Sequence, residues 1–323
     1  MSKHKLAILC FAVLGFVNSF AVDNSIYIDQ TGSNSTVNIN QDGAGNKVGG
    51  LGSGGPADSN RAILYGNAQT VTVNQVGSNN TLQENLRTVA TSGNGNNFNY
   101  SATGNSNQAV IDSNSAGASG ASDSNNVGLT ITGNSNVNKV NVVGTTNNIT
   151  TTVGGSGTGS NSNVVNQTQN GTNNTQTVSV GGGNGNTVNV FQGLVANPDS
   201  TAPAVPGTST NTAWSATLNG IDSSVAGGSS TSGTASITIT GATNTVNIGQ
   251  VGTGNSFTAT ITGNTNGISD NQTGGGNSTT VLSYTGSSNL ANITQTSSSG
   301  TNNTLNMKVT GSANTTTITQ NGH

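Results

Sequence analysis

The chain has 323 residues, of which 5% are charged, 3% are aromatic and 47 are glycines, and its formal net charge is -3. Such a composition offers no basic patch for nucleic acid or anionic lipid, and a single cysteine excludes a disulfide framework. Two histidines and ten scattered acids leave little for general acid-base or metal chemistry. We therefore expect no enzyme, no cofactor and no metal site.

The first 21 residues have the pattern of a secretory signal peptide. Lys3 and Lys5 precede an apolar run, Leu6–Val17, and Ser19–Ala21 ends in the small-x-small pattern of a cleavage site. A membrane anchor would need about 20 apolar residues, and this run is shorter. We expect a secreted chain located outside the cell or at its surface, with no membrane insertion after cleavage. Cleavage would remove the only cysteine and two of the seven basic residues, so the net charge becomes 5 − 10 = −5.

Repeats begin directly after this segment. Apolar and polar residues alternate through Ile26–Gln30, and the same alternation returns eleven residues later in Val37–Gln41. A period of two residues is typical of a β-strand. Gly43 and Asn46 follow, and these two residue types tolerate the positive φ angles of tight turns. Each repeat is therefore predicted to form one strand followed by one tight turn.

Three stretches interrupt the repeats. The register breaks near 47–69 and near 112–125, and the longest break, 193–233, is rich in Pro, Gly and Ser. We interpret all three as insertions that leave the repeat units on either side intact, so that the repeats occupy 22–192 and 234–323. The four prolines fall inside the insertions, as expected if every strand donates its N–H groups to a neighbour.

The most regular stretch is Ile237–Gln272. Gly241, Gly252 and Gly263 stand eleven residues apart, and each is followed three residues later by Asn. Gln250 and Gln272 occupy equivalent places 22 residues apart, which indicates that two strands make one coil. A strand of this length cannot bury a face alone, but stacked coils give each strand two hydrogen-bonding neighbours. The sequence predicts an all-β fold, a β-solenoid with two-strand coils of about 22 residues.

The amides at fixed positions of the repeat are expected to stack into hydrogen-bonded ladders inside the solenoid. These residues are Gln30, Gln41, Gln75, Gln169, Gln250, Gln272, Gln295, Gln320, Asn46, Asn80, Asn174, Asn255 and Asn277. The glycines expected in the turns are Gly43, Gly77, Gly171, Gly241, Gly252, Gly263, Gly274 and Gly311. The alternative for the amides is a set of sugar ligands.

The recurring motif Gln-x-Gly-x-x-Asn resembles the repeat of curlins, the subunits of bacterial curli fibres. It occurs at Gln41–Asn46, Gln75–Asn80, Gln169–Asn174, Gln250–Asn255 and Gln272–Asn277. The resemblance implies secretion, a strand-turn-strand coil, and self-assembly into amyloid-like extracellular fibres that hold cells to surfaces and to one another. This chain departs from the pattern by its extra repeats, its insertions, and a first repeat that directly follows the signal peptide.

We thus expect a structural or adhesive protein whose main partner is another copy of itself. Both ends of the repeat array, Ile26–Ile28 and Thr317–Gln320, are good strands without proline, so end-to-end stacking is expected. One alternative is a non-polymerising attachment fibre that binds surface polysaccharide or a host cell surface. Another is an ice-binding solenoid, for which the outward threonines Thr238, Thr240, Thr258, Thr260, Thr262, Thr315 and Thr317 are the candidates.

Overall fold

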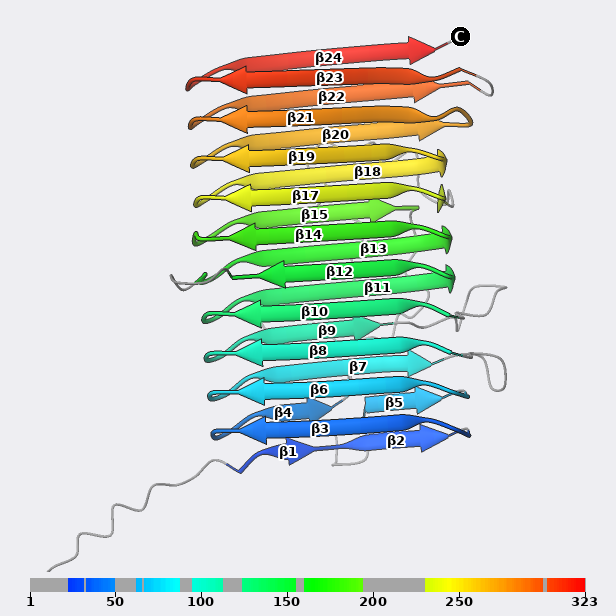
Figure 1. Cartoon of the computed structure of the whole chain (residues 1–323), viewed down its shortest axis with the longest axis vertical. Coiled ribbons are helices and arrows are strands. Elements are labelled where there is room, and N and C mark those ends of the chain that lie inside the picture. Colours follow the sequence, from blue (N-terminus) through cyan, green and yellow to red (C-terminus); the bar gives the residue numbers. More distant parts are fainter. Residues whose placement is uncertain are drawn as a thin grey trace, which may run out of the picture.

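The chain folds into a β-solenoid, as Figure 1 shows. This computed structural model describes residues 23–31, 33–49, 62–65, 67–87, 95–112, 124–154, 160–193, 230–298 and 301–322. Every helix or strand assigned in these ranges is a strand, and the strands form two sheets in which all neighbours run parallel. The predicted fold class is confirmed.

The sheet with fourteen strands is called the long sheet here. Its members are β1 (Ser25–Ile26), β2 (Ile28–Thr31), β4 (Lys47–Gly49), β5 (Ala62–Tyr65), β7 (Thr81–Arg87), β9 (Gln108–Asp112), β11 (Val137–Thr145), β13 (Val164–Thr172), β15 (Thr187–Gln192), β16 (Ser230–Thr231), β18 (Thr245–Thr253), β20 (Gly267–Gly274), β22 (Leu290–Ser297) and β24 (Thr315–Gly322). Three pairs of short strands, β1 with β2, β4 with β5, and β15 with β16, each fill a single row. The fourteen strands therefore occupy 14 − 3 = 11 rows.

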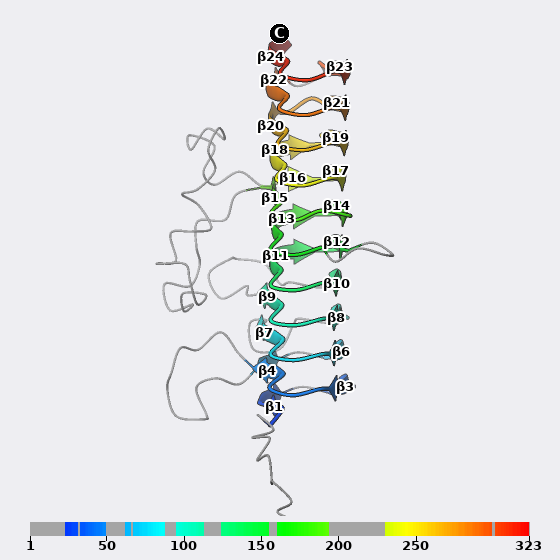
Figure 2. The same ribbon diagram turned by 90° about the vertical axis from the view of Figure 1, so that its left-hand side faces the viewer.

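The other sheet has ten strands in ten rows and is called the short sheet. Its members are β3 (Thr36–Asp42), β6 (Thr70–Val76), β8 (Asn97–Thr103), β10 (Asn126–Thr132), β12 (Asn148–Val153), β14 (Thr175–Gly181), β17 (Thr234–Thr240), β19 (Ser256–Thr262), β21 (Ser278–Thr285) and β23 (Asn303–Thr310). The chain visits the two sheets alternately, so successive rows of one sheet belong to successive coils. Figure 2 shows the sheets edge-on as two facing stacks.

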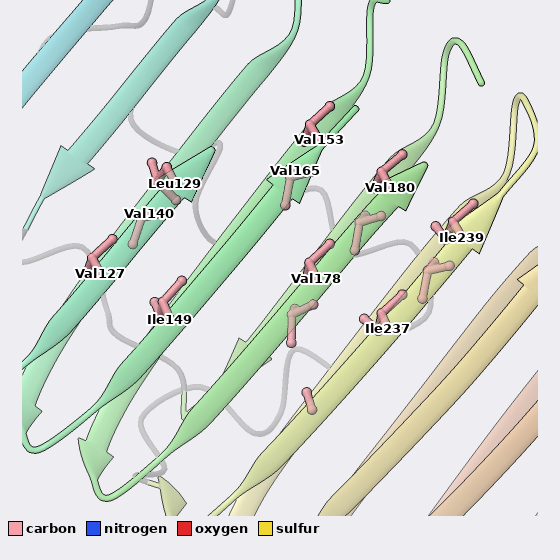
Figure 3. Packing of buried hydrophobic residues seen from close by; sticks show 14 of the residues in the cluster. Val127, Leu129, Val140, Ile149, Val153, Val165, Val178, Val180, Ile237 and Ile239 are labelled. Carbon is pink, nitrogen blue, oxygen red and sulfur yellow. The ribbon is translucent and has the colours of Figure 1, made fainter. Parts of the chain in front are cut away.

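The core lies between the two sheets and consists of the alternate residues of every strand. In β19, Phe257, Ala259 and Ile261 are buried, whereas Thr260 and Thr262 on the other face are exposed. Parallel pairing without a shift places like positions above one another, as in the pair Ile239 and Ile261. Figure 3 shows the resulting stripes of Val, Ile and Leu side chains at like positions of neighbouring strands, such as Val127 and Ile149. Burial of these stripes supplies most of the driving force for folding.

Two strands that the alternation did not reveal complete the stack: β7 and β9. Glu84 stands at an inward position of β7 and breaks the apolar pattern there, although Leu82 beside it is buried. β9 is only five residues long and ends at Asp112. Both strands pair in register with their neighbours, so the solenoid is continuous where the sequence pattern fades.

The boundaries predicted for two insertions need correction. Residues 47–49 and 62–65, assigned to the insertion near 47–69, form β4 and β5, and Gln69 is buried. Residues 230–233, assigned to the insertion 193–233, form β16 and the turn after it. Each of these insertions divides one row of the long sheet into two short strands, and the point of division cannot be found from the periodicity alone. The predicted signal peptide lies outside the described residues. So does most of the insertion near 112–125, although Asp112 and Asn125 at the two ends of this insertion belong to the solenoid.

Candidate functional site: amide ladders and open ends

One asparagine ladder follows the edge where the chain passes from the short sheet into the long sheet. In each step the backbone N–H of one asparagine donates to Oδ1 of the asparagine one coil earlier, at 2.9–3.1 Å. The eleven members are Asn24, Asn46, Asn80, Asn107, Asn136, Asn163, Asn186, Asn244, Asn266, Asn289 and Asn314. This first asparagine ladder is unbroken, and it contains the predicted Asn46 and Asn80.

Each internal amide of this ladder also donates a hydrogen bond to a backbone carbonyl in a turn of the next coil. Asn244 Nδ2, for example, donates to Oδ1 of Asn186 at 3.1 Å and to the carbonyl oxygen of Gly263 at 2.9 Å. The same pattern recurs at Asn266, whose Nδ2 reaches the carbonyl of Gly286. Buried polar groups are costly unless paired, so this arrangement explains why only asparagine fits here.

A second asparagine ladder follows the opposite edge, and it is interrupted. Asn96, Asn125, Asn147 and Asn174 are joined in the same way, but Gly233 occupies the next position. The predicted Asn174 and Asn255 belong to this ladder.

The prediction for Asn277 is wrong. Its side chain is exposed, and Ser278 takes the ladder position, where the Ser278 N–H donates to Asn255 Oδ1 at 3.1 Å. The turn after Gly274 is one residue longer than the turn after Gly252. Residues 272–277 therefore match the sequence motif, but Asn277 lies one position before the place that the ladder requires.

Six glutamines form a third ladder inside the long sheet. The Nε2 of every member except the last, Gln320, donates to Oε1 of the glutamine in the following coil, at 2.6–3.1 Å, and the members are Gln169, Gln192, Gln250, Gln272, Gln295 and Gln320. Each Nε2 also reaches a backbone carbonyl at the start of the adjacent strand of the short sheet, as from Gln250 to Thr234 at 3.1 Å. The ladder thereby joins the two sheets.

The remaining predicted glutamines lie elsewhere. Gln75 Nε2 donates to Gln41 Oε1 at 3.0 Å, but both residues belong to the short sheet and form a separate pair. Gln30 is exposed and lies beside Leu64, so it joins no glutamine ladder. Gln192 is a ladder member that the repeat motif does not identify, because the insertion follows it directly and hides its place in the repeat.

All eight predicted turn glycines have positive φ, between 101° and 132°. Coils also approach one another closely there: a Cβ on Gly263 would lie 1.9 Å from the carbonyl oxygen of Gly286 in the next coil. Gly311 differs, because a Cβ there would meet nothing nearer than Asn314 Nδ2 at 3.5 Å. The turns therefore require glycine for its backbone angle and, inside the stack, also for its lack of a side chain.

Two buried carboxyls, together with the buried Gln167, break the apolar central stripe of the long sheet. Burial raises the pKa of Glu84 to about 8, and its carboxyl oxygens have no hydrogen-bond partner among the described residues. Burial raises the pKa of Asp270 to about 7, which the Thr280 hydroxyl and the Asn271 backbone lower only in part. The Thr280 hydroxyl donates to Gln295 Oε1 at 2.9 Å, and among the described residues neither Asp270 carboxyl oxygen has a hydrogen bond of normal geometry, so these two groups stabilise the carboxylate only weakly.

The two ends of the described solenoid are open. β1, β2 and β3 at one end, and β23 and β24 at the other, each pair on one side only among the described strands (Figure 1). Their inward apolar residues are only partly buried, namely Ile28, Val37, Ile39, Leu305, Met307, Val309 and Ile318. Unpaired strand edges over half-exposed apolar side chains are a template for further pairing.

The proposed threonine array does not form one surface. Thr238 pairs with Thr260, and Thr240 with Thr262, on the outer face of the short sheet, where Thr258 also lies. Thr315 and Thr317 belong to β24 in the long sheet, so they face a different side.

Neither a metal nor a membrane is indicated by the part of the chain that the structure describes. It contains no group of three or more His, Cys, Asp or Glu placed to hold a metal ion. No helix long and apolar enough to cross a membrane occurs among the described residues. In comparisons with known proteins, no family model matches the sequence and no curated protein matches it.

Proposed function

We propose that this chain is a secreted, curlin-like structural or adhesive protein that assembles end to end into extracellular fibres. The observation that carries the proposal is the pair of open ends: among the described strands, the outermost rows of both sheets pair on one side only, and seven apolar residues there are only partly buried. Stacking of a second copy would pair those edges and bury those residues, and a head-to-tail contact of this kind does not close, so it produces filaments.

The ladders support this assembly because they are directional. Among the described residues, Asn314 Oδ1 accepts no hydrogen bond from a following coil, and the Asn24 N–H donates to no preceding one. The amides within the stack make these bonds at every step, so the end of one copy complements the beginning of the next. The signal-peptide pattern of residues 1–21 and the likeness to curlin repeats favour action outside the cell.

Electron microscopy of the purified chain from Val22 onward, together with thioflavin fluorescence, tests the proposal. Unbranched filaments that bind the dye are expected, and stable monomers at micromolar concentration would contradict it. Monomers would favour the alternative function, an attachment fibre whose loops or outer faces bind surface polysaccharide or a host cell surface.

A further inference from the structure

The two sheets of the described solenoid differ by one row. The long sheet has eleven rows and the short sheet has ten, because β1–β2 precedes β3 and β24 follows β23. Rows within a sheet are about 4.8 Å apart. If β1–β2 of one copy simply lay on β24 of another, the long sheet would continue. The short sheet would then be missing one row between β23 and β3.

The first and last rows of the long sheet share one sequence motif. Residues 24–32 read Asn-Ser-Ile-Tyr-Ile-Asp-Gln-Thr-Gly, and residues 314–322 read Asn-Thr-Thr-Thr-Ile-Thr-Gln-Asn-Gly. Asn, Ile, Gln and Gly therefore recur at the same four positions. Asn24 and Asn314 are also the two end members of the first asparagine ladder. β24 can accordingly occupy the place of β1–β2 with its inward residues in register.

β1–β2 is the weaker occupant of its row. It pairs over two positions with β4 and four with β5, whereas β24 pairs without interruption over eight positions with β22. Ile26 is 48% exposed and Tyr27 is 43% exposed, so the release of this row costs little buried apolar area. Gln30 at its end belongs to no glutamine ladder, whereas Gln320 in β24 accepts a hydrogen bond from Gln295.

We infer that β24 of one copy displaces β1–β2 of the next copy and pairs with the β4–β5 edge in its place. This inference rests on the proposed end-to-end assembly. Displacement removes one row from the long sheet of each copy, so each copy then contributes ten rows to the long sheet and ten rows to the short sheet. At the junction, β23 of one copy then pairs directly with β3 of the next. Both sheets become continuous. The apolar residues of β3 and β23 (Val37, Ile39, Leu305, Met307 and Val309) become internal, while Ile26, Tyr27 and Ile28 are released.

The register of the exchange is specified by the pairing within one chain. Ser25 lies opposite Lys47, and Thr315 is the equivalent of Ser25 in the shared motif. Thr315 of one copy should therefore lie beside Lys47 of the next. In simple stacking, Thr315 would instead lie beside Ser25, and Lys47 would be a further row away at roughly 9.6 Å, beyond the Cα separation that a disulfide spans.

Cross-linking within filaments separates these arrangements. Chains that start at Val22 contain no cysteine, so Thr315→Cys chains can be mixed with differently tagged Lys47→Cys or Ser25→Cys chains, assembled and oxidised. We expect a 315–47 disulfide and at least tenfold less of the 315–25 disulfide. The reverse ratio overturns the exchange while leaving end-to-end assembly intact. If neither mixture nor the parent chain forms filaments, the proposed function itself fails.

A pinned variant provides an independent readout. In Ser25→Cys/Lys47→Cys chains, an oxidised disulfide holds β1 on β4, and its formation is checked by titration of free thiols. Filament growth should slow at least tenfold when the pair is oxidised and recover on reduction. Equal growth in both states overturns the inference, since simple stacking needs no displacement. The chain carrying Lys47→Cys alone is the matched control for the effect of the oxidant.

Discussion

Gln250 Nε2 lies 2.8 Å from Oε1 of Gln272 in the next coil, and the same nitrogen also donates to the backbone carbonyl of Thr234 in the other sheet. One amide group therefore connects two neighbouring coils and the two sheets. A carboxylate has the same shape but donates no hydrogen bond. The glutamine ladder thus depends on the chemistry of the amide and not only on its size.

Glutamate at Gln250 and Gln272 should prevent folding at neutral pH. Both residues are fully buried, so at neutral pH the two glutamates must either carry like charges in adjacent coils or take up protons, and in both cases the amide donors of the ladder are lost. Breaking a buried polar pair in this way costs on the order of 3 kcal/mol or more per site. Urea unfolding followed by circular dichroism measures the loss. The control is glutamate at Thr258 and Thr260 on the outer face, and equal loss in both double variants would contradict the assigned ladder.

Alanine at Gly263 should be far more damaging to folding than alanine at Gly311. Both glycines have positive φ, so each substitution carries a backbone strain of about 1 kcal/mol. Only at Gly263 would the added Cβ collide with a carbonyl, that of Gly286 at 1.9 Å. Thermal unfolding of the two variants measures the difference. A similar decrease in melting temperature for both would indicate that the coils are not packed as closely as described.

The Gly311→Ala variant should be impaired in filament growth although it folds. In the preceding coils of this turn stack, the equivalent glycine lies directly against the next coil: a Cβ on Gly286 would lie 1.9 Å from the carbonyl oxygen of Gly311. In the exchanged junction, where β23 pairs directly with β3, a second copy on the C-terminal end would supply the same contact to Gly311, and the methyl group would then block it. Thioflavin kinetics of folded Gly311→Ala chains test this expectation, and growth at the parental rate would contradict the exchanged junction.

Stability should fall as pH rises because of the two buried carboxyls. Their pKa values are about 8 for Glu84 and about 7 for Asp270 in the folded chain, against 4.5 and 3.8 in an unperturbed state. The folded chain thus holds protons that the unfolded chain releases. The contribution is fully present below the unfolded pKa and is lost as pH rises through the folded pKa, by at most about 1.4 kcal/mol per pH unit and group.

Glu84→Gln and Asp270→Asn should therefore raise stability at pH 8 and flatten its dependence between pH 4 and 8, measured by urea titration at several pH values. The lower limit is close to the unperturbed pKa values of the two carboxyls, about 4, and the upper limit is the pKa of Glu84 in the folded chain, about 8. Asp42→Asn, at an exposed position of β3, is the matched control for the loss of one carboxyl group. An unchanged slope in the two buried-site variants would show that neither carboxyl is buried as described.

Removal of residues 194–229 should leave the solenoid folded. Gln192 pairs with Gln169, and Ser230 pairs with Gly171. One residue separates the two partners in β13, so Gly193 alone is enough to join β15 and β16 into one strand. Far-ultraviolet circular dichroism should retain its strand signal, and the melting temperature should stay within a few degrees. The control is a deletion of 193–229, which removes the joining residue as well and should shift the register of β16. Collapse of the strand signal in the first deletion would mean that the removed segment is required for the core.

The sequence alone determined the elements that depend on local chemistry. Alternation of apolar and polar residues identified most strands, because side chains of a strand point to opposite faces. Glycines such as Gly252 and Gly274 marked the turns because of their backbone freedom, and the 22-residue spacing of Gln250 and Gln272 gave the size of a coil. The pairing of those two glutamines is confirmed.

Only the tertiary structure decided which repeats lie on one another and where each amide belongs. Asn277 has the motif but lies outside the ladder, while Ser278 lies inside it, since one extra residue in a turn shifts everything that follows. β7 is a strand despite Glu84, because its neighbours on both sides hold it in register. The physical reason is the same in each case: hydrogen bonds between coils join residues some 20 to 60 positions apart, whereas sequence periodicity reports only the conformation within one coil.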